Sequence, residues 1–235
     1  MKPEEAIILA GGIGTRLKTL VKDIPKPMAP IGEKPFLEYL LNYLHGYGIK
    51  HVILSVGYKW EIIREYFGND HRSMKISYAV EEEPLGTGGG IRLAMTYLEG
   101  VHTFILNGDT FFQVDLNDLS EFYFAHKADL SMAVKRMHNF SRYGSVELDV
   151  CKVSGFREKK PLRAGFINGG VYATSKYLFD PFEFPEKFSF EQDVLTKQLK
   201  NLKICAMNSP GYFIDIGIPS DYELAIRQLP ELVIV

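Results

Sequence analysis

The sequence predicts an α/β protein with a mainly parallel central sheet and a small β-rich subregion. Strand and helix patterns alternate through the first half of the chain. The strand patterns are short and almost continuously apolar, which is typical of parallel strands that are covered on both faces. The patterns between them are amphipathic with helical spacing, so we expect helices to pack on the sheet as βαβ units.

The elements of the first half follow one another in a regular order. The segment AIILAG (6–11) predicts a fully buried strand. In 35–48, Phe36, Leu40 and Leu44 recur at helical spacing and predict a helix. The other elements of this half are predicted strands at 51–57, 75–81 and 102–109 and predicted helices at 59–68 and 89–99.

The second half of the chain has a less regular pattern. Its elements are predicted strands at 130–137, 143–150 and 165–174, a predicted helix at 189–201 and a final helix from about Pro219. No segment rich in proline, glycine or serine separates the two halves. We therefore expect a single domain over 1–235, in which the β-rich subregion is inserted or appended.

Composition and charge argue against several classes of protein. A content of 46% hydrophobic and 24% charged residues is ordinary for a globular protein. The net charge of −2 gives no electrostatic support for a nucleic-acid or membrane partner, so we expect neither. Cys151 and Cys205 lack metal-ligand spacing, and so few cysteines fit the reducing cytoplasm. We expect no transmembrane helix and no signal peptide, because no apolar run has the required length and flanks.

The segment LAGGIGTRL (9–17) places glycines directly after the first predicted strand. Because glycine lacks a Cβ, ligand atoms can approach its backbone N–H group, and clustered N–H groups attract anions. A tight strand-to-helix turn without a ligand explains the segment equally well. Two familiar phosphate loops do not fit, because no Lys-Ser/Thr follows Gly14 and Leu17 stands where a dinucleotide fingerprint needs its third glycine.

Two charged residues downstream strengthen the case for an anion site. Lys26 stands between Pro25 and Pro27, which stiffen the backbone from which its side chain projects. Asp109 ends the fourth predicted strand, in the sequence Asn-Gly-Asp. Because open α/β sheets bind ligands beyond the carboxyl ends of their strands, we expect Asp109 and the glycine loop to face one crevice. A carboxylate beside a phosphate loop is a pattern of metal sites.

Sugar-phosphate nucleotidyltransferases have a signature that closely resembles two segments of this chain, LAGGIGTRL and PKPMAPIGEKP. Further segments similar to this family follow in the family's order over almost the whole chain: EEPLGTGGGI, LNGDTFF, GFREK, INGGVY, FSFEQDVL and FIDIGIPSDY. The resemblance implies a Rossmann-like, three-layer α/β/α fold of GT-A type. It also implies the reaction of a sugar 1-phosphate with a nucleoside triphosphate, which yields a nucleotide sugar and pyrophosphate.

The same resemblance implies roles for individual residues. Asp109 and Asp215 would hold Mg²⁺, and they would act in catalysis together with the cations Arg16 and Lys26. The nucleotide would bind to Leu9, Ala10, Gly11, Gly12, Gly14, Thr15, Arg16, Pro84, Leu85, Gly86, Thr87, Gly88 and Asn107. The sugar phosphate would bind to Glu158, Lys159, Asn168, Gly169 and Glu191.

Two positions depart from the family's pattern. The stretch 16–24 contains no proline, although the family often has one there, so this loop can follow a different path. Lys160 separates Lys159 from the next proline, which leaves either lysine as the contact to the sugar phosphate. Two of the implied roles have structural alternatives. Asp109 can be a turn residue, and Asp215 can cap the final helix.

Within the family, the overall pattern is most similar to the D-glycero-α-D-manno-heptose 1-phosphate guanylyltransferases, which implies that sugar phosphate and GTP as substrates. The alternative is mannose, glucose or N-acetylhexosamine 1-phosphate with GTP or UTP. A non-catalytic regulatory subunit and a dinucleotide-dependent oxidoreductase are weaker alternatives, because both acids and both cations are present and the dinucleotide fingerprint is incomplete. The family's habit favours a homodimer.

Overall fold

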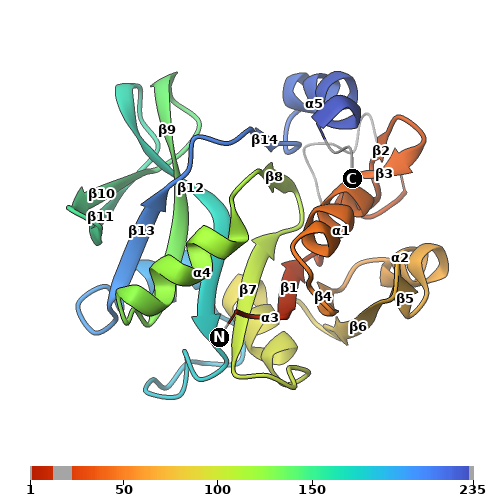
Figure 1. The fold of residues 1–235 in the computed structure, drawn as a ribbon, viewed down its shortest axis with the longest axis horizontal. Helices are drawn as coiled ribbons and strands as arrows, with labels where there is room; N and C mark the ends of the chain where they lie inside the picture. The colour runs from red at the N-terminus through yellow and green to blue at the C-terminus, as the bar shows by residue number, and fades with distance from the viewer. Residues whose placement is uncertain (1, 13–22, 233–235) are drawn as a thin grey trace.

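The structure is a computed structural model that describes residues 2–12 and 23–232. One sheet of ten strands dominates this part of the chain (Figure 1). The strands of this sheet are, in sheet order, β10 (Ser145–Asp149), β11 (Lys152–Arg157), β13 (Ile204–Asn208), β9 (Leu130–Phe140), β12 (Leu162–Ser175), β7 (His102–Asn107), β1 (Glu5–Leu9), β4 (His51–Val56), β6 (Met74–Val80) and β5 (Asp70–His71). The sheet therefore contains strands from both halves of the chain.

Parallel pairing is concentrated in the part of the sheet that the first half of the chain builds. There β1 pairs in parallel with β4 and β7, and β4 pairs in parallel with β6. Beyond β7 the sheet is mixed, because β12 is antiparallel to both β7 and β9, whereas β13 is parallel to β9. The predicted α/β class is confirmed, and most antiparallel pairs lie in the second half.

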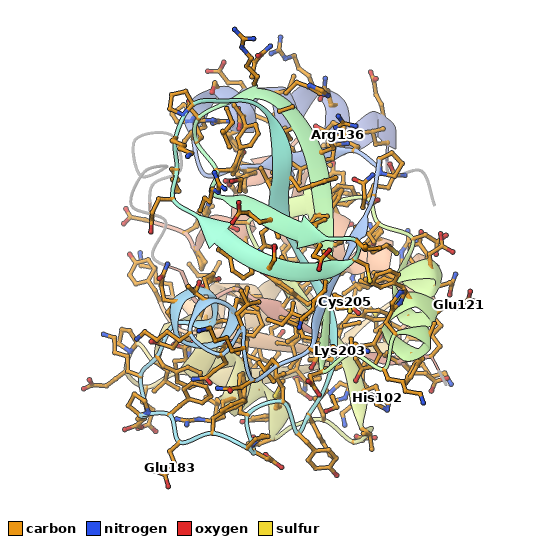
Figure 2. All side chains as sticks on the ribbon, turned by 90° about the vertical axis from the view of Figure 1, so that its left-hand side faces the viewer. His102, Glu121, Arg136, Glu183, Lys203 and Cys205 are labelled. Carbon is orange, nitrogen blue, oxygen red and sulfur yellow. The ribbon has the colours of Figure 1, made fainter. Side chains whose placement is uncertain are left out.

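Helices lie on both faces of this sheet. They are α1 (Phe36–Gly46), α2 (Trp60–Phe67), α3 (Gly86–Met95), α4 (Leu116–Ala125), the π-type helix η2 (Phe190–Thr196) and α5 (Pro219–Leu232). Ala6 and Ile8 of β1 share one core with α1, α2, α4 and α5. Ile7 between them points to the opposite core, which contains α3 and η2. Figure 2 views these layers from the side, with α4, marked by Glu121, on the right of the strands.

The β-rich subregion consists of the β10–β11 hairpin and the adjoining parts of β9 and β12. Figure 2 looks onto this hairpin. Ser145 of β10 is the register partner of Ile167 in β12, so the hairpin continues the main sheet. Sequence analysis predicted a strand at 143–150 but missed β11. Among the described residues, no helix is long and apolar enough to cross a membrane.

Two short strand pairs lie outside the main sheet and were not predicted. They are β8 (Thr110–Phe112) with β14 (Phe213–Asp215), and β2 (Pro30–Ile31) with β3 (Lys34–Pro35). The antiparallel β8–β14 pair places Asp215 opposite Thr110. The N–H of Ile216 extends this pairing by donating to the carbonyl of Asp109 at 3.0 Å. Two distant parts of the chain are thereby joined at the backbone.

Helix α3 begins at Gly86, whereas the sequence predicts a helix from residue 89 onward. Its glycines at 88–90 are buried, and the segment that precedes η2 packs against Gly88 and Gly89. A Cβ on Gly89 would lie 2.7 Å from the carbonyl oxygen of Glu186. Glycine is a poor helix former in isolation, so the early start of α3 reflects tertiary packing that sequence propensity does not register.

The packing of α3 gives a stability test. Gly89→Ala is expected to lower the free energy of unfolding by about 1–3 kcal/mol, because the new methyl group overlaps a backbone carbonyl that cannot move freely. Gly46→Ala in α1 is the matched control, since a Cβ there meets nothing within 4 Å. The control is expected to be neutral or more stable by up to about 1 kcal/mol. Denaturant unfolding of both variants measures the difference, and equal stability of Gly89→Ala and the wild type would contradict this account.

Candidate active site

A cavity of about 720 Å³ lies at the carboxyl ends of the central strands. Leu9 at the end of β1 and Asn107 at the end of β7 are register partners, and both line it. This is the edge at which open α/β sheets bind their ligands. The lining residues are Leu9, Gly11, Gly12, Lys26, Pro27, Ser55, Gly57, Tyr58, Glu81, Glu82, Pro84, Gly86, Thr87, Asn107, Asp109 and Glu191.

Many residues predicted from the sequence meet on this wall, although they come from separate segments. Three of the predicted nucleotide-binding residues lie just behind it. Ala10 is buried, and its N–H donates to the carbonyl of Ser55 at 2.8 Å. The carbonyl of Leu85 accepts from the N–H of Phe188, and the N–H of Gly88 donates to the carbonyl of Phe188, each at 3.0 Å. Gly14, Thr15 and Arg16 lie outside the described residues.

Lys26 projects from η1 (Lys26–Met28), a single 3₁₀ turn. The N–H of Met28 donates to the carbonyl of Pro25 at 2.8 Å, and the N–H of Ala29 donates to that of Lys26 at 3.0 Å. Pro25 and Pro27 fix their own φ angles, so this turn has little freedom. The backbone therefore directs the Lys26 side chain, which is 11% exposed, to the cavity wall.

Asp109 and Asp215 approach the same ammonium group. The Nζ atom of Lys26 lies 2.6 Å from Oδ2 of Asp109 and 3.8 Å from Oδ1 of Asp215. The β8–β14 pair holds both acids in place, because Asp109 directly precedes β8 and Asp215 ends β14. Asp215 does not appear on the cavity wall, so this cluster stands at the edge of the cavity.

The environment of Asp215 disfavours its negative charge. Burial raises its pKa, and the nearby carboxylate of Asp109 raises it further. Lys26 and the N–H of Gly217, which donates to Oδ1 of Asp215 at 2.7 Å, act in the opposite direction. Two neighbouring carboxylates, of which Asp215 is partly buried, attract a cation. They therefore fit a hard divalent ion that prefers carboxylate oxygens.

Glu81 connects three parts of the opposite wall. Its Oε2 accepts from the N–H of Leu85 at 2.9 Å, and its Oε1 accepts from the hydroxyl of Ser55 at 3.2 Å. A Cβ on Gly11 would lie 3.1 Å from the same Oε1, so the glycine loop begins beside this carboxylate. Sequence analysis missed Glu81. Its position at the end of the third predicted strand was the available signal, because neighbouring strand ends face the same crevice.

Thr87 and Glu191 form a bridge across the cavity wall. The Thr87 hydroxyl donates to Oε2 of Glu191 at 2.7 Å and accepts from the N–H of Phe190 at 2.9 Å. The hydroxyl of Ser189 also donates to Oε2 of Glu191, at 3.1 Å. A predicted nucleotide-binding residue and a predicted sugar-binding residue are thereby linked directly.

Asn168 and Gly169 lie in an irregular part of β12, beside Asn107. The side chain of Asn168 donates to the hydroxyl of Tyr172 at 2.6 Å and accepts from the N–H of Gly170 at 3.0 Å. A Cβ on Gly170 would lie 2.5 Å from Nδ2 in the side chain of Asn107. The backbone at 168–170 therefore packs tightly against the end of β7, although neither Asn168 nor Gly169 lines the cavity.

Glu158 and Lys159 lie apart from the other predicted residues. Both are exposed in the stretch that follows β11, as is Lys160, and none of the three lines the cavity. The structure does not bring them to the Lys26 cluster, and it does not distinguish Lys159 from Lys160 as a phosphate contact.

Tyr143 flanks the acidic cluster on the side of the β-rich subregion and was not predicted. Burial raises its pKa to about 12, with Asp215 as the next cause, so the phenol keeps its proton at neutral pH. Its ring packs edge-on against Phe213 of β14, with 5.7 Å between centroids. The neighbouring Arg142 forms an ion pair of 2.6 Å with Asp221 in the first turn of α5. The β9–β10 connection is thereby tied to α5.

Comparisons with known proteins agree with this arrangement. The D-glycero-alpha-D-manno-heptose 1-phosphate guanylyltransferase of Aneurinibacillus thermoaerophilus is 49% identical over 225 residues, covering 96% of this chain and 98% of that protein. The protein of the same name from Campylobacter jejuni is 48% identical over 219 residues, covering 93% and 96%. Among solved structures, HddC from Yersinia pseudotuberculosis, complexed with GMP-PN, is similar with a TM-score of 0.86 at 39% identity, covering 95% of this chain and 98% of that chain.

A family model described as nucleotidyl transferase matches residues 5–231. The matched region runs from the first strand of the sheet through α5, so it contains the cavity and the acidic cluster. It also contains every segment that resembles the family in the sequence. This chain belongs to the nucleotidyl transferase family.

Proposed function

We propose that this protein transfers a guanylyl group from GTP to D-glycero-α-D-manno-heptose 1-phosphate, forming the GDP-sugar and pyrophosphate. The observation that carries the proposal is the convergence of Lys26, Asp109 and Asp215 at the edge of a cavity of about 720 Å³. The two curated relatives that bear this activity in their names match over 93% and 96% of the chain. The similar structure of HddC was solved with GMP-PN.

The attacking group requires no catalytic base. A phosphate monoester has a second pKa of about 6, so the sugar 1-phosphate is largely dianionic at neutral pH. Its oxygen attacks the α-phosphorus of the nucleotide, and the bond to pyrophosphate breaks. Two polyanions must approach each other in this step, so catalysis depends on positioning and on neutralising charge.

Charge neutralisation is the role that we assign to Lys26 and the glycine loop. Lys26 lines the cavity, and its ammonium group is proposed to contact the phosphates of a nucleotide bound there. Gly11 and Gly12 line the cavity, where exposed backbone N–H groups can contact phosphate oxygens. Arg16, from the predicted continuation of this loop, is proposed to bind the phosphates as well.

A divalent cation, proposed to be Mg²⁺, fits between Asp109 and Asp215. Both carboxylates come within 4 Å of one point, which the ammonium group of Lys26 marks at 2.6 and 3.8 Å. When bound there, Mg²⁺ would neutralise charge on the α-phosphate and on the departing pyrophosphate. The two acids would hold the ion in place. Burial keeps the nearby hydroxyl of Tyr143 protonated, so it adds no negative charge to the site.

Guanine selection is assigned to Glu81 and to the first turn of α3. Guanine presents two adjacent donors, its N1–H and its 2-amino group, and a carboxylate accepts from both. Glu81 lines the cavity, and its hydrogen bond to the N–H of Leu85 positions it beside the residues predicted to lie along the base. Uracil has no equivalent pair of donors, so this carboxylate favours GTP over UTP.

The sugar is the least constrained part of the proposal. Mannose-1-phosphate guanylyltransferases also match this chain, at lower identity, which keeps mannose 1-phosphate as the second candidate. Asn168, Gly169 and Glu191 are proposed to contact the sugar, with Glu158 and Lys159 at its phosphate. Because both substrates are charged metabolites that membranes retain, we place the reaction in the cytoplasm.

A pyrophosphate-release assay tests the activity directly. Purified protein is incubated with each of four nucleoside triphosphates and with heptose, mannose, glucose or N-acetylglucosamine 1-phosphate, with and without Mg²⁺. We expect the highest kcat/KM for GTP with the heptose phosphate, and loss of turnover when EDTA removes the metal. Faster turnover with another pair of substrates would replace the proposed specificity, and absence of turnover with every pair would refute the activity.

The acidic pair gives a second prediction. Asp109→Asn and Asp215→Asn are each expected to lower kcat by at least about 100-fold, because the metal-bound transition state loses a carboxylate ligand. Asp149→Asn, at an exposed position at the end of β10, is the control and should retain wild-type turnover. Circular dichroism checks that the variants remain folded. Near-normal Mg²⁺-dependent rates in a folded Asp109 or Asp215 variant would remove that residue from the proposed centre.

The role of Glu81 gives a third prediction. Glu81→Gln loses one of the two acceptors that face the guanine donors, so the ratio of kcat/KM for GTP to that for UTP should fall by at least about 10-fold. Glu83→Gln is the matched control, because Glu83 is exposed and does not line the cavity. An unchanged ratio in Glu81→Gln would show that other groups select the base.

A further inference from the structure

The ammonium group of Lys26 contacts both acids of the candidate site. It lies 2.6 Å from Asp109 and 3.8 Å from Asp215, which is the position that we propose for the divalent ion. The Lys26 side chain is 11% exposed, whereas the side chains of Asp109 and Asp215 are 43% and 33% exposed. The lysine is therefore inserted beneath two carboxylates that remain accessible from outside.

Local packing is built around this position of Lys26. The rigid η1 turn fixes where the side chain begins. Gly217 leaves space at its other end, because a Cβ there would lie 3.2 Å from the Lys26 ammonium and 2.7 Å from Oδ1 of Asp215. The N–H of Gly217 holds that same Asp215 oxygen. The contact is thus supported from both sides and is not a loose surface ion pair.

A lysine ammonium and a divalent ion cannot both occupy this position. The two carboxylates carry at most two negative charges, and Lys26 already neutralises one of them. A divalent ion that entered beside Lys26 would meet a like charge a few ångströms away, which opposes its binding. The lysine therefore has to withdraw from the acids before the ion can contact both of them.

We propose that Lys26 is a resident counter-ion of the acidic pair, which a divalent ion displaces only when the nucleotide phosphates offer the lysine a new partner. This inference rests on the proposed function for the identity of the nucleotide. An ammonium group with so little exposure is costly to leave unpaired, so its release requires a substitute anion. The triphosphate supplies that anion, and its oxygens also complete the coordination of the ion.

The small number of protein ligands also makes binding of the ion depend on the nucleotide. Within residues 2–12 and 23–232, no group of three or more His, Cys, Asp and Glu side chains is placed to hold a metal ion. Two carboxylates and a competing ammonium group make a weak site by themselves. The divalent ion and the nucleotide are therefore expected to strengthen each other's binding, which is a reciprocal coupling.

Mn²⁺ binding to the full-length protein without nucleotide tests this inference, because electron paramagnetic resonance measures free Mn²⁺ directly. Lys26→Met removes the competing charge, so we expect it to bind Mn²⁺ at least about 10-fold more tightly than the wild type. Lys26→Arg keeps a cation and should bind as weakly as the wild type. Lys34→Met removes an exposed lysine that pairs with Glu38 at 2.8 Å, and it should leave Mn²⁺ affinity unchanged.

A second measurement adds GTP. GTP is expected to tighten Mn²⁺ binding to the wild type more than to Lys26→Met, after correction for Mn²⁺ bound by free GTP, because the variant has no lysine to release. Lys26→Gln repeats the comparison with a polar side chain if the methionine variant does not fold. Equal or weaker Mn²⁺ binding by folded Lys26→Met and Lys26→Gln, relative to the wild type, would overturn the inference.

The outcomes separate this inference from the proposed function. If removing Lys26 tightens Mn²⁺ binding but no pair of substrates releases pyrophosphate, the counter-ion role stands and the proposed activity fails. If GTP and the heptose phosphate react but Mn²⁺ affinity is insensitive to Lys26, the activity stands and the counter-ion role is wrong.

Discussion

The electrostatic repulsion between Asp109 and Asp215 is the constraint on which the rest of the site depends. The β8–β14 pair joins their backbones, so the two acids are held near each other. Burial of Asp215 adds to the cost and raises its pKa. Positive charge must therefore be supplied locally, and Lys26 supplies it from a turn that two prolines stiffen. Two neighbouring carboxylates attract cations to this site. Cations there can neutralise the charge of two phosphates that react with each other.

The two halves of the sheet make different contributions to the cavity. In the parallel half, β1, β4, β6 and β7 end at one edge, and the residues that follow them form the wall on which we place the nucleotide. In the mixed half, β12 runs antiparallel to β7, and its residue Gly170 packs against the side chain of Asn107 at the same edge. One sheet thus brings residues from early and late segments to a common site.

Much of this organisation could be predicted from the sequence, because local patterns determine it. The central strands, α1 and α2 follow from apolar periodicity, and Lys26 and Asp109 stand out through their immediate neighbours. The β8–β14 pair could not be predicted in this way, since two three-residue strands are stabilised by contacts between distant segments. The start of α3 was missed because glycines favour a loop until packing excludes larger side chains. Glu81 was missed because its role depends on contacts with Ser55, Leu85 and Gly11, which a local sequence pattern does not show.

Thr87 joins two segments of the cavity wall that are far apart in the sequence. One oxygen atom donates to Glu191 and accepts from the N–H of Phe190, so the position needs a side chain that is both donor and acceptor. The first turn of α3 and the segment at 189–191 therefore form one hydrogen-bonded unit. A chimera that exchanges residues 84–88 between relatives of different specificity would also have to exchange the segment at 189–191, because Thr87 would otherwise lose its hydrogen bonds to Glu191 and Phe190.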